Sequence, residues 1–321
     1  MKKYIYLDWN VVKYLRENRN GQEFHDAELN ALIFRLRNRY IFPFSLYHVQ
    51  DRIANYNPVY EKNVSDDLTF FEKLADQNCI GWNDFKKDIE IAKVPISVCR
   101  AEVENEKKKK LPVYPITKMI KEYKVDMSKL DKSHPMYEFL ESHQAKMNPL
   151  LMQEFLDSFY NSIFDDGNLY KKFRNYVSSH KEEILNPPIE NHSNLLSFLH
   201  CYFAPYIQSF DYDFDQLLKN WGNIANSWFS FTYGSDIPHG VLLSHGYMLL
   251  EGHPLFHDKI SKNKNNLSNI NRDSNHLFFA SQAEYLISED KHFRDKAKFI
   301  YKVYDIKTKV VSETEFLEKF C

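Results

Sequence analysis

The acidic residues near the two ends of the chain offer the clearest chemistry in this sequence. Four aspartates stand beside short hydrophobic runs or within helical patterns: Asp8, Asp51, Asp273 and Asp290. Carboxylates that converge from different segments bind Mg²⁺ or Mn²⁺, and such ions activate water and neutralise charge on a phosphate. This chemistry requires a fold that brings the two ends of the chain together.

Asp8 ends the run Tyr4–Leu7, whose aromatic and β-branched residues are typical of a buried strand. In open α/β sheets ligands bind at the carboxyl ends of the strands, so this carboxylate is suited to hold a metal ion or a phosphate group. Asn10 adds an amide two positions later. The alternative is that Asp8 only caps the helix that starts near Val11, because Asp is a favoured N-cap residue.

A second strand is predicted at Tyr40–Phe44, after a helical stretch over 11–39. The β-α-β order predicts a parallel pair of strands with a right-handed crossover.

Ser45 follows this strand as the expected N-cap of a helix over 46–53. In that helix His48 and Asp51 lie three residues apart and share one face, which would bring Asp51 beside Asp8. Taken alone, the simpler interpretation of Asp51 is an exposed acid paired with a nearby arginine, Arg52 or Arg35. Likewise, the simpler interpretation of His48 is a packed histidine.

Asp273 opens a predicted helix over 273–283, and a predicted strand over 284–288 leads to Asp290. A helix start and a strand end can meet at one edge of a sheet. A helix from Lys291, short strands at 301–305 and 309–312 and a helix over 313–320 complete the chain.

Together these positions resemble the PIN domain, a Rossmann-like nuclease family whose four acids hold Mg²⁺ or Mn²⁺ and which cleaves RNA. Asp8, Asp273 and Asp290 match the first, third and fourth acids, and Asp51 or a nearby residue matches the second, although this position is more often Glu in the family. The two polar positions also match: Asn10 corresponds to the usual Asn, and Ser288 to the Ser or Thr two places before the last acid.

The resemblance implies an α/β protein with the three-layer PIN fold, in which segments 1–56 and 250–321 form a central parallel sheet. Residues 57–249 are then a mostly α-helical insertion, with amphipathic helices at 68–74, 152–164, 169–177, 195–206 and 214–228. The run Lys107–Lys110 is interpreted as a solvated helix face, with an RNA-contacting patch as the alternative. Segment 263–271 is expected to be a loop.

The activity that the resemblance implies is metal-dependent endoribonuclease cleavage. Asp8 and Asp273 are expected to be the closest metal ligands, Asp51 a direct or water-mediated ligand and Asp290 an outer or second-metal ligand. Asn10 and Ser288 would orient these acids. His276, one helical turn after Asp273, either contacts the scissile phosphate or attacking water or is a buried histidine.

The expected partner is an RNA substrate, with tRNA and other structured RNAs as candidates. The insertion would restrict the substrate or keep the nuclease inactive until a protein partner binds. Effectors of toxin–antitoxin and phage-defence systems are common among PIN proteins. The sequence leaves open whether the protein forms a homo-oligomer.

The composition excludes several classes of function. The chain has 321 residues, a net charge of −2 and 8 glycines, without a glycine-rich phosphate loop. Four dispersed cysteines make no zinc-binding spacing and are expected to be free thiols. No apolar run approaches the roughly 20 residues of a membrane span. These features predict a soluble cytoplasmic protein without a membrane partner.

Two other functions compete with the nuclease. A haloacid dehalogenase phosphatase also has a strand that ends in Asp, but its general acid is a second Asp at the position of Asn10, and an amide cannot serve in that role. A catalytically weak PIN-like module could instead use the helical insertion to bind a protein. The presence of all four acids favours the nuclease over this module.

Overall fold

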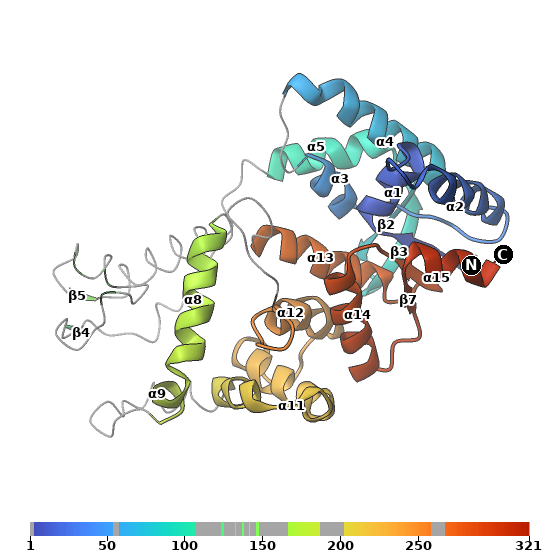
Figure 1. Cartoon of the computed structure of the whole chain (residues 1–321). Helices are drawn as coiled ribbons and strands as arrows, with labels where there is room; N and C mark the ends of the chain where they lie inside the picture. Colours follow the sequence, from blue (N-terminus) through green and yellow to red (C-terminus); the bar gives the residue numbers. More distant parts are fainter. Residues whose placement is uncertain are drawn as a thin grey trace. The chain divides into compact units, whose positions relative to one another are not determined.

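The computed structural model describes residues 3–53, 58–106, 166–186, 202–257 and 267–320, with a few isolated residues between 107 and 165. The chain divides into two compact units (Figure 1). The first comprises Met1–Lys108, Tyr212–His257 and Asn271–Cys321, and the second comprises Lys109–Asp211 and Asp258–Ile270. The first unit therefore joins both chain ends with residues 58–106 and 212–249.

A small parallel sheet in the first unit joins the two ends of the chain. Its strands are β1 (Ile5–Leu7), β6 (Tyr285–Ile287) and β7 (Lys309–Val311), in the order β1-β6-β7. Segments from the N-terminal and C-terminal parts of the chain thus lie side by side (Figure 1). The predicted strand at 40–44 is present only as isolated parallel bridges, Tyr4 with Ile41 and Phe44 with Cys79.

The alternation of side chains along the strands assigns each residue to a face of the sheet. Ile5 and Leu7 of β1 lie in a hydrophobic core with Tyr285 and Ile287 of β6 and with helices from residues 9–106 and 313–320. Tyr6 is also buried, but its hydroxyl hydrogen-bonds with His276, which lies in the helix Leu267–Ala280. Both faces of the sheet are therefore covered, as expected for parallel strands that are hydrophobic throughout.

The N-terminal helices are α1 (Trp9–Arg16), α2 (Glu23–Leu36) and α3 (Leu46–Ile53). The single helix predicted over 11–39 is wrong, because the chain turns at 17–22, where Gly21 has a φ of 77°. Glycine tolerates this left-handed conformation without steric cost, which ends the helical run. The helix at 46–53 is confirmed.

A β-hairpin separates the next two helices, α4 (Glu61–Ala75) and α5 (Ile96–Glu106). Its strands are β2 (Asn78–Asn83) and β3 (Asp88–Lys93), which pair antiparallel. The sequence pattern predicts a mostly α-helical region here and no such hairpin. Asp76 and Gln77 have positive φ values and stop α4, and the alternating Asp-Ile-Glu-Ile pattern of β3 is the period-2 signal of a half-buried strand.

The remaining helices of the first unit are α11 (Phe214–Tyr233), α12 (His239–Glu251), α13 (Leu267–Ala280, from Asn271 onward), α14 (Lys291–Val303) and α15 (Glu313–Phe320). Helices α11 and α12 pack against α14. The predicted strand at 301–305 is wrong, since α14 continues to Val303. The predicted loop at 263–271 is wrong from Leu267 onward, where α13 begins, so Asp273 lies inside this helix and does not open it.

In the second unit the structure describes α8 (Gly167–Ser179) and α9 (Lys181–Leu185), and the chain is helical over 202–208. Asp166 caps α8 by accepting hydrogen bonds from two backbone N–H groups. The predicted helix at 152–164 and the run Lys107–Lys110 lie outside the described residues. Among the described residues, no helix is both long enough and apolar enough to cross a membrane.

Candidate active site

Asp8 lies where β1 ends, and its side chain is only 8% exposed. Its backbone N–H donates to Ile287 of β6 at 2.9 Å, and the Ser288 hydroxyl donates to its Oδ2 at 2.7 Å. Asp8 occupies the N-cap position of α1, but its carboxylate makes no capping hydrogen bond. The carboxylate therefore faces the end of the neighbouring strand, and helix capping does not account for it.

Asp290 follows the end of β6 and also contacts Ser288, but its carboxylate caps a helix, unlike that of Asp8. Asp290 is exposed, and its backbone N–H donates to the Ser288 hydroxyl at 3.1 Å. Its own carboxylate caps α14 by accepting the N–H of Phe293 at 3.0 Å. The Ser288 hydroxyl thus contacts both the Asp8 carboxylate and the Asp290 backbone.

Asp51 is held by two residues of α13. His276 donates from Nε2 to Asp51 Oδ2 at 2.8 Å, and the Arg272 guanidinium donates to Oδ1. Neither arginine named by the sequence analysis pairs with Asp51; Arg52, for instance, pairs with Asp67. The contacts from α13 bring Asp51 to the side of the sheet where Asp8 lies.

A chain of buried hydrogen bonds supports His276 from its other ring nitrogen. Nδ1 of His276 lies 2.7 Å from the Tyr6 hydroxyl, which lies 2.9 Å from the Ser45 hydroxyl. The Ser45 backbone N–H donates to Nδ1 of His48 at 2.9 Å, and His48 donates from Nε2 to the Leu7 carbonyl at 2.7 Å. His48 is therefore a packed, hydrogen-bonded histidine, as its simpler interpretation has it.

Asp273 is half-buried in α13. Among the described residues its carboxylate has no hydrogen-bond or ion-pair partner. Burial raises its pKa well above the usual range, and the charges of Asp51, Asp8 and Asp290 raise it further, against a lowering effect of Lys296. The other three predicted acids are thus near enough to Asp273 to disfavour its charged form.

The other two buried acids differ in how their charge is compensated. Burial raises the pKa of Asp8 to about 6, although the charge of His276 and the hydrogen bond from Ser288 oppose the increase. Burial would also raise the pKa of Asp51, but its contacts with His276 and Arg272 outweigh this effect and lower the pKa. Asp51 is therefore stabilised as an anion, whereas Asp8 and Asp273 carry charge at a cost.

These acids suit a hard cation in chemical type. Mg²⁺ and Mn²⁺ prefer carboxylate oxygens, and a cation beside Asp8 and Asp273 would offset the burial of their charge. The four acids do not form a tight ligand set, however. Within the described ranges, the one group of potential ligand atoms all within 4.8 Å of one another consists of His25, Asp26 and Glu313.

That tighter group already has a basic partner, Arg19. The Arg19 guanidinium makes ion pairs with both Asp26 and Glu313, whose carboxylates are fully buried. The guanidinium supplies positive charge to these carboxylates at the place where a metal ion would otherwise do so. We therefore interpret His25, Asp26 and Glu313 as a structural cluster.

Two other residues complete the comparison with the predicted site. Asn10 is exposed in the first turn of α1, and the structure gives its side chain no hydrogen bond to any of the four acids. Arg272 is a further residue of the site that the sequence pattern did not predict. The available signal was its spacing from His276, because residues four apart on a helix share a face.

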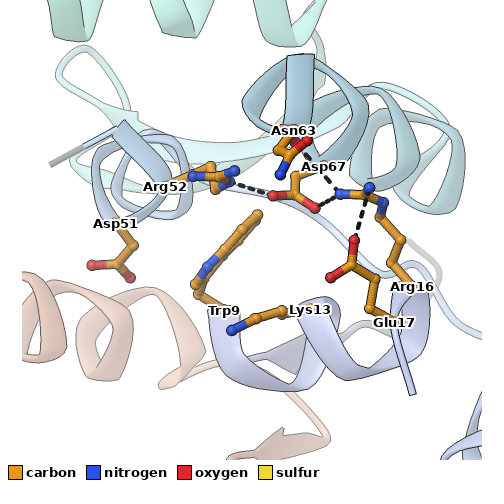
Figure 2. A pocket seen from close by; sticks show the side chains of 8 residues that line it. All are labelled: Trp9, Lys13, Arg16, Glu17, Asp51, Arg52, Asn63 and Asp67. Carbon is orange, nitrogen blue, oxygen red and sulfur yellow. Dashed lines mark hydrogen bonds and ion pairs between the residues drawn. The ribbon is translucent and has the colours of Figure 1, made fainter. Parts of the chain in front are cut away.

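A cavity of about 320 Å³ opens beside Asp51 (Figure 2). It is lined by residues of α1, α3 and α4 and by Glu17, which follows α1: Trp9, Lys13, Arg16, Glu17, Asp51, Arg52, Asn63 and Asp67. Asp67 accepts ion pairs from both Arg16 and Arg52. The cavity thus combines an indole ring, basic groups and one of the four predicted acids.

Comparison with known proteins identifies no relative: no protein-family model, curated protein or solved structure matches the chain.

Proposed function

We propose that the protein is a metal-dependent endoribonuclease that uses Asp8, Asp51, Asp273 and Asp290 around one or two Mg²⁺ or Mn²⁺ ions. The observation that carries this proposal is the Asp273 carboxylate, which is half-buried, has no described partner and lies within the electrostatic influence of the other three acids. A protein gains no stability from this arrangement, because burying an unpaired carboxylate is costly. A bound cation would compensate the buried negative charge, and this relief would contribute to the affinity of the site for the cation.

The proposal includes the three-layer PIN fold. A PIN-like fold is supported by parallel strands β1 and β6 that end at Asp8 and Ser288, and by helices on both faces of the sheet. The order of the four acids along the chain supports it as well. RNA is the proposed substrate because of this resemblance, and effectors of toxin–antitoxin or phage-defence systems are the roles that it suggests.

Each residue has a distinct part in the proposed reaction. Asp8 and Asp273 would hold the ion, which supplies charge for a transferring phosphate and lowers the pKa of water. His276 and Arg272 keep Asp51 charged and fixed in position. The Ser288 hydroxyl orients the Asp8 carboxylate by donating a hydrogen bond to it. Asp290, whose carboxylate caps α14, would be the outer or second-metal ligand.

Substitution of Asp273 by Asn tests the proposal, with Asp8→Asn beside it. We expect cleavage of single-stranded RNA in Mn²⁺ to fall by at least about 100-fold, because charge stabilisation of the transition state is lost. Without metal, Asp273→Asn should raise the thermal stability of the fold, since it removes a buried charge. Mn²⁺ should stabilise the wild type by linkage and leave this variant unchanged.

An acid outside the site provides the control. Asp66 lies on α4, and the Asp66→Asn variant should cleave RNA and respond to Mn²⁺ as the wild type does. Wild-type protein that cleaves no RNA and shows no thermal response to Mn²⁺ or Mg²⁺ would contradict the proposal.

A further inference from the structure

The cavity beside Asp51 offers two chemically different binding groups on one helix. Trp9 and Lys13 are four residues apart on α1, so they share a face of that helix. Trp9 is half-buried, with its ring centroid 6.2 Å from that of Phe71, and Lys13 is exposed. Figure 2 shows the Trp9 ring between Asp51 on one side and Arg16 and Glu17 on the other.

The charged groups that line the cavity are unequally compensated. Asp67 makes ion pairs with both Arg16 and Arg52, and Arg16 also pairs with Glu17 at 3.0 Å, so both guanidinium groups have acidic partners. Lys13 has no ion-pair partner within the part of the chain that the structure describes. One free ammonium group therefore stands beside an indole ring.

This pairing is complementary to a nucleotide. An aromatic ring stacks on the flat face of a base, and an ammonium group attracts a phosphate. Only an unpaired base exposes its face for such stacking, so the complementary ligand is single-stranded. The volume of about 320 Å³ is in the range of cavities that hold one small ligand.

We propose that this cavity binds one unpaired nucleotide of a single-stranded RNA, with its base on Trp9 and a phosphate on Lys13. The inference rests on the proposed nuclease function and extends it, because Trp9 directly follows Asp8 and Asp51 lines the cavity. A nucleotide held there would lie beside Asp51, one of the four acids. The substrate is thus an unpaired segment, within a loop or at an end, and not a continuous duplex.

Binding of a fluorescein-labelled single-stranded RNA in EDTA, where cleavage cannot occur, tests this subsite. We expect Trp9→Ala to weaken binding about tenfold or more, as for loss of a stacked base, and Trp9→Phe to recover most of it. Lys13→Gln should weaken binding and reduce the slope of log affinity against log salt by about 0.7. A duplex RNA of the same sequence should bind more weakly than the single strand.

Matched controls lie outside the cavity. Trp82→Ala removes a half-exposed tryptophan of β2, and Lys219→Gln removes an exposed lysine of α11. Both controls should bind the RNA as the wild type does. Circular dichroism melting establishes that Trp9→Ala is folded, and Lys13→Gln gives an independent test at an exposed position.

The subsite and the nuclease can fail separately. Unchanged binding in both Trp9→Ala and Lys13→Gln, or an equal loss in the two controls, overturns the subsite even if the wild type cleaves RNA. Binding that depends on Trp9 and Lys13 supports the subsite, and absence of cleavage by the same wild-type protein in Mn²⁺ would then count against the nuclease alone.

Discussion

Asp51 shows how a single residue of this site depends on a distant helix. Its two carboxylate oxygens accept hydrogen bonds from Arg272 and His276, and these contacts lower its pKa despite burial. Groups that orient a metal-binding carboxylate in this way affect affinity without touching the substrate. Arg272 is therefore a positioning residue.

Replacing Arg272 by Gln should weaken the site through Asp51. We expect a 10- to 100-fold lower rate of RNA cleavage at subsaturating Mn²⁺, roughly the effect of losing a second-layer partner, and partial recovery at high Mn²⁺. Titration of cleavage rate against Mn²⁺ measures the shift. Arg39→Gln, an exposed residue, is the control. An unchanged Mn²⁺ requirement in Arg272→Gln would show that Asp51 is positioned without this arginine.

Glu313 is a second residue whose protonation affects the fold. Its side chain is fully buried, one of its carboxylate oxygens has no hydrogen bond, and burial raises its pKa to about 7, with the charge of Glu289 adding to the increase. The folded protein therefore holds this proton more tightly than the unfolded chain between pH 4.5 and pH 7. Stability from this group is present at low pH and is lost as the pH rises through about 7.

Glu313→Gln should remove this pH dependence. Between pH 4.5 and pH 8 the free energy of unfolding of the wild type should fall relative to that of the variant, by up to about 3 kcal/mol. Urea unfolding at a series of pH values measures the difference, with exposed Glu318→Gln as the control. A difference between wild type and Glu313→Gln that stays constant with pH would mean that Glu313 is ionised throughout.

At the scale of elements, the β2–β3 hairpin meets α5 through a pair of thiols. Cys79 of β2 and Cys99 of α5 have their sulfur atoms 3.8 Å apart. A disulfide requires about 2.05 Å, so a small movement of either element would allow the bond to form. Helix α5 also packs on α3, the helix that carries Asp51.

Oxidised glutathione should convert these two thiols to a disulfide by thiol–disulfide exchange. The bond would close a loop of about 20 residues and stabilise the fold by about 3 kcal/mol. Thiol titration and a thermal melt before and after oxidation detect both effects. Cys79→Ser should show neither the loss of the Cys99 thiol nor the rise in melting temperature. Equal behaviour of wild type and Cys79→Ser would place the reactive thiols elsewhere.

The elements also show which sequence patterns are decisive. Strands β6 and β7 and helices α3, α14 and α15 follow from hydrophobic runs and capping residues, and the structure confirms them. The hairpin and the start of α13 were not predicted, because the period-2 signal of β3 covers only a few residues and polar residues at 267–275 conceal a helix. Both errors concern elements whose stability comes from tertiary packing.

At the scale of the whole molecule, short segments far apart in sequence form one sheet. The resemblance to the PIN domain predicted that segments from both ends of the chain form one parallel sheet, and the structure confirms a small parallel sheet in which β1 and β6 are neighbours. No pattern in the sequence could show that His276 and Arg272 both contact Asp51, because these contacts depend on how α13 packs against α3. The cavity at Trp9 likewise depends on the packing of three helices.

The parallel pair of β1 and β6 also has a consequence for protein synthesis. Ser288 follows Asp8 by 280 residues, so the Ser288 hydroxyl can donate its hydrogen bond to Asp8 only after this long stretch of chain has been synthesised. The edge strand β7 follows later still. The proposed site therefore cannot assemble on a nascent chain that still lacks β6, because Asp8 and Asp290 come together only when β1 and β6 pair.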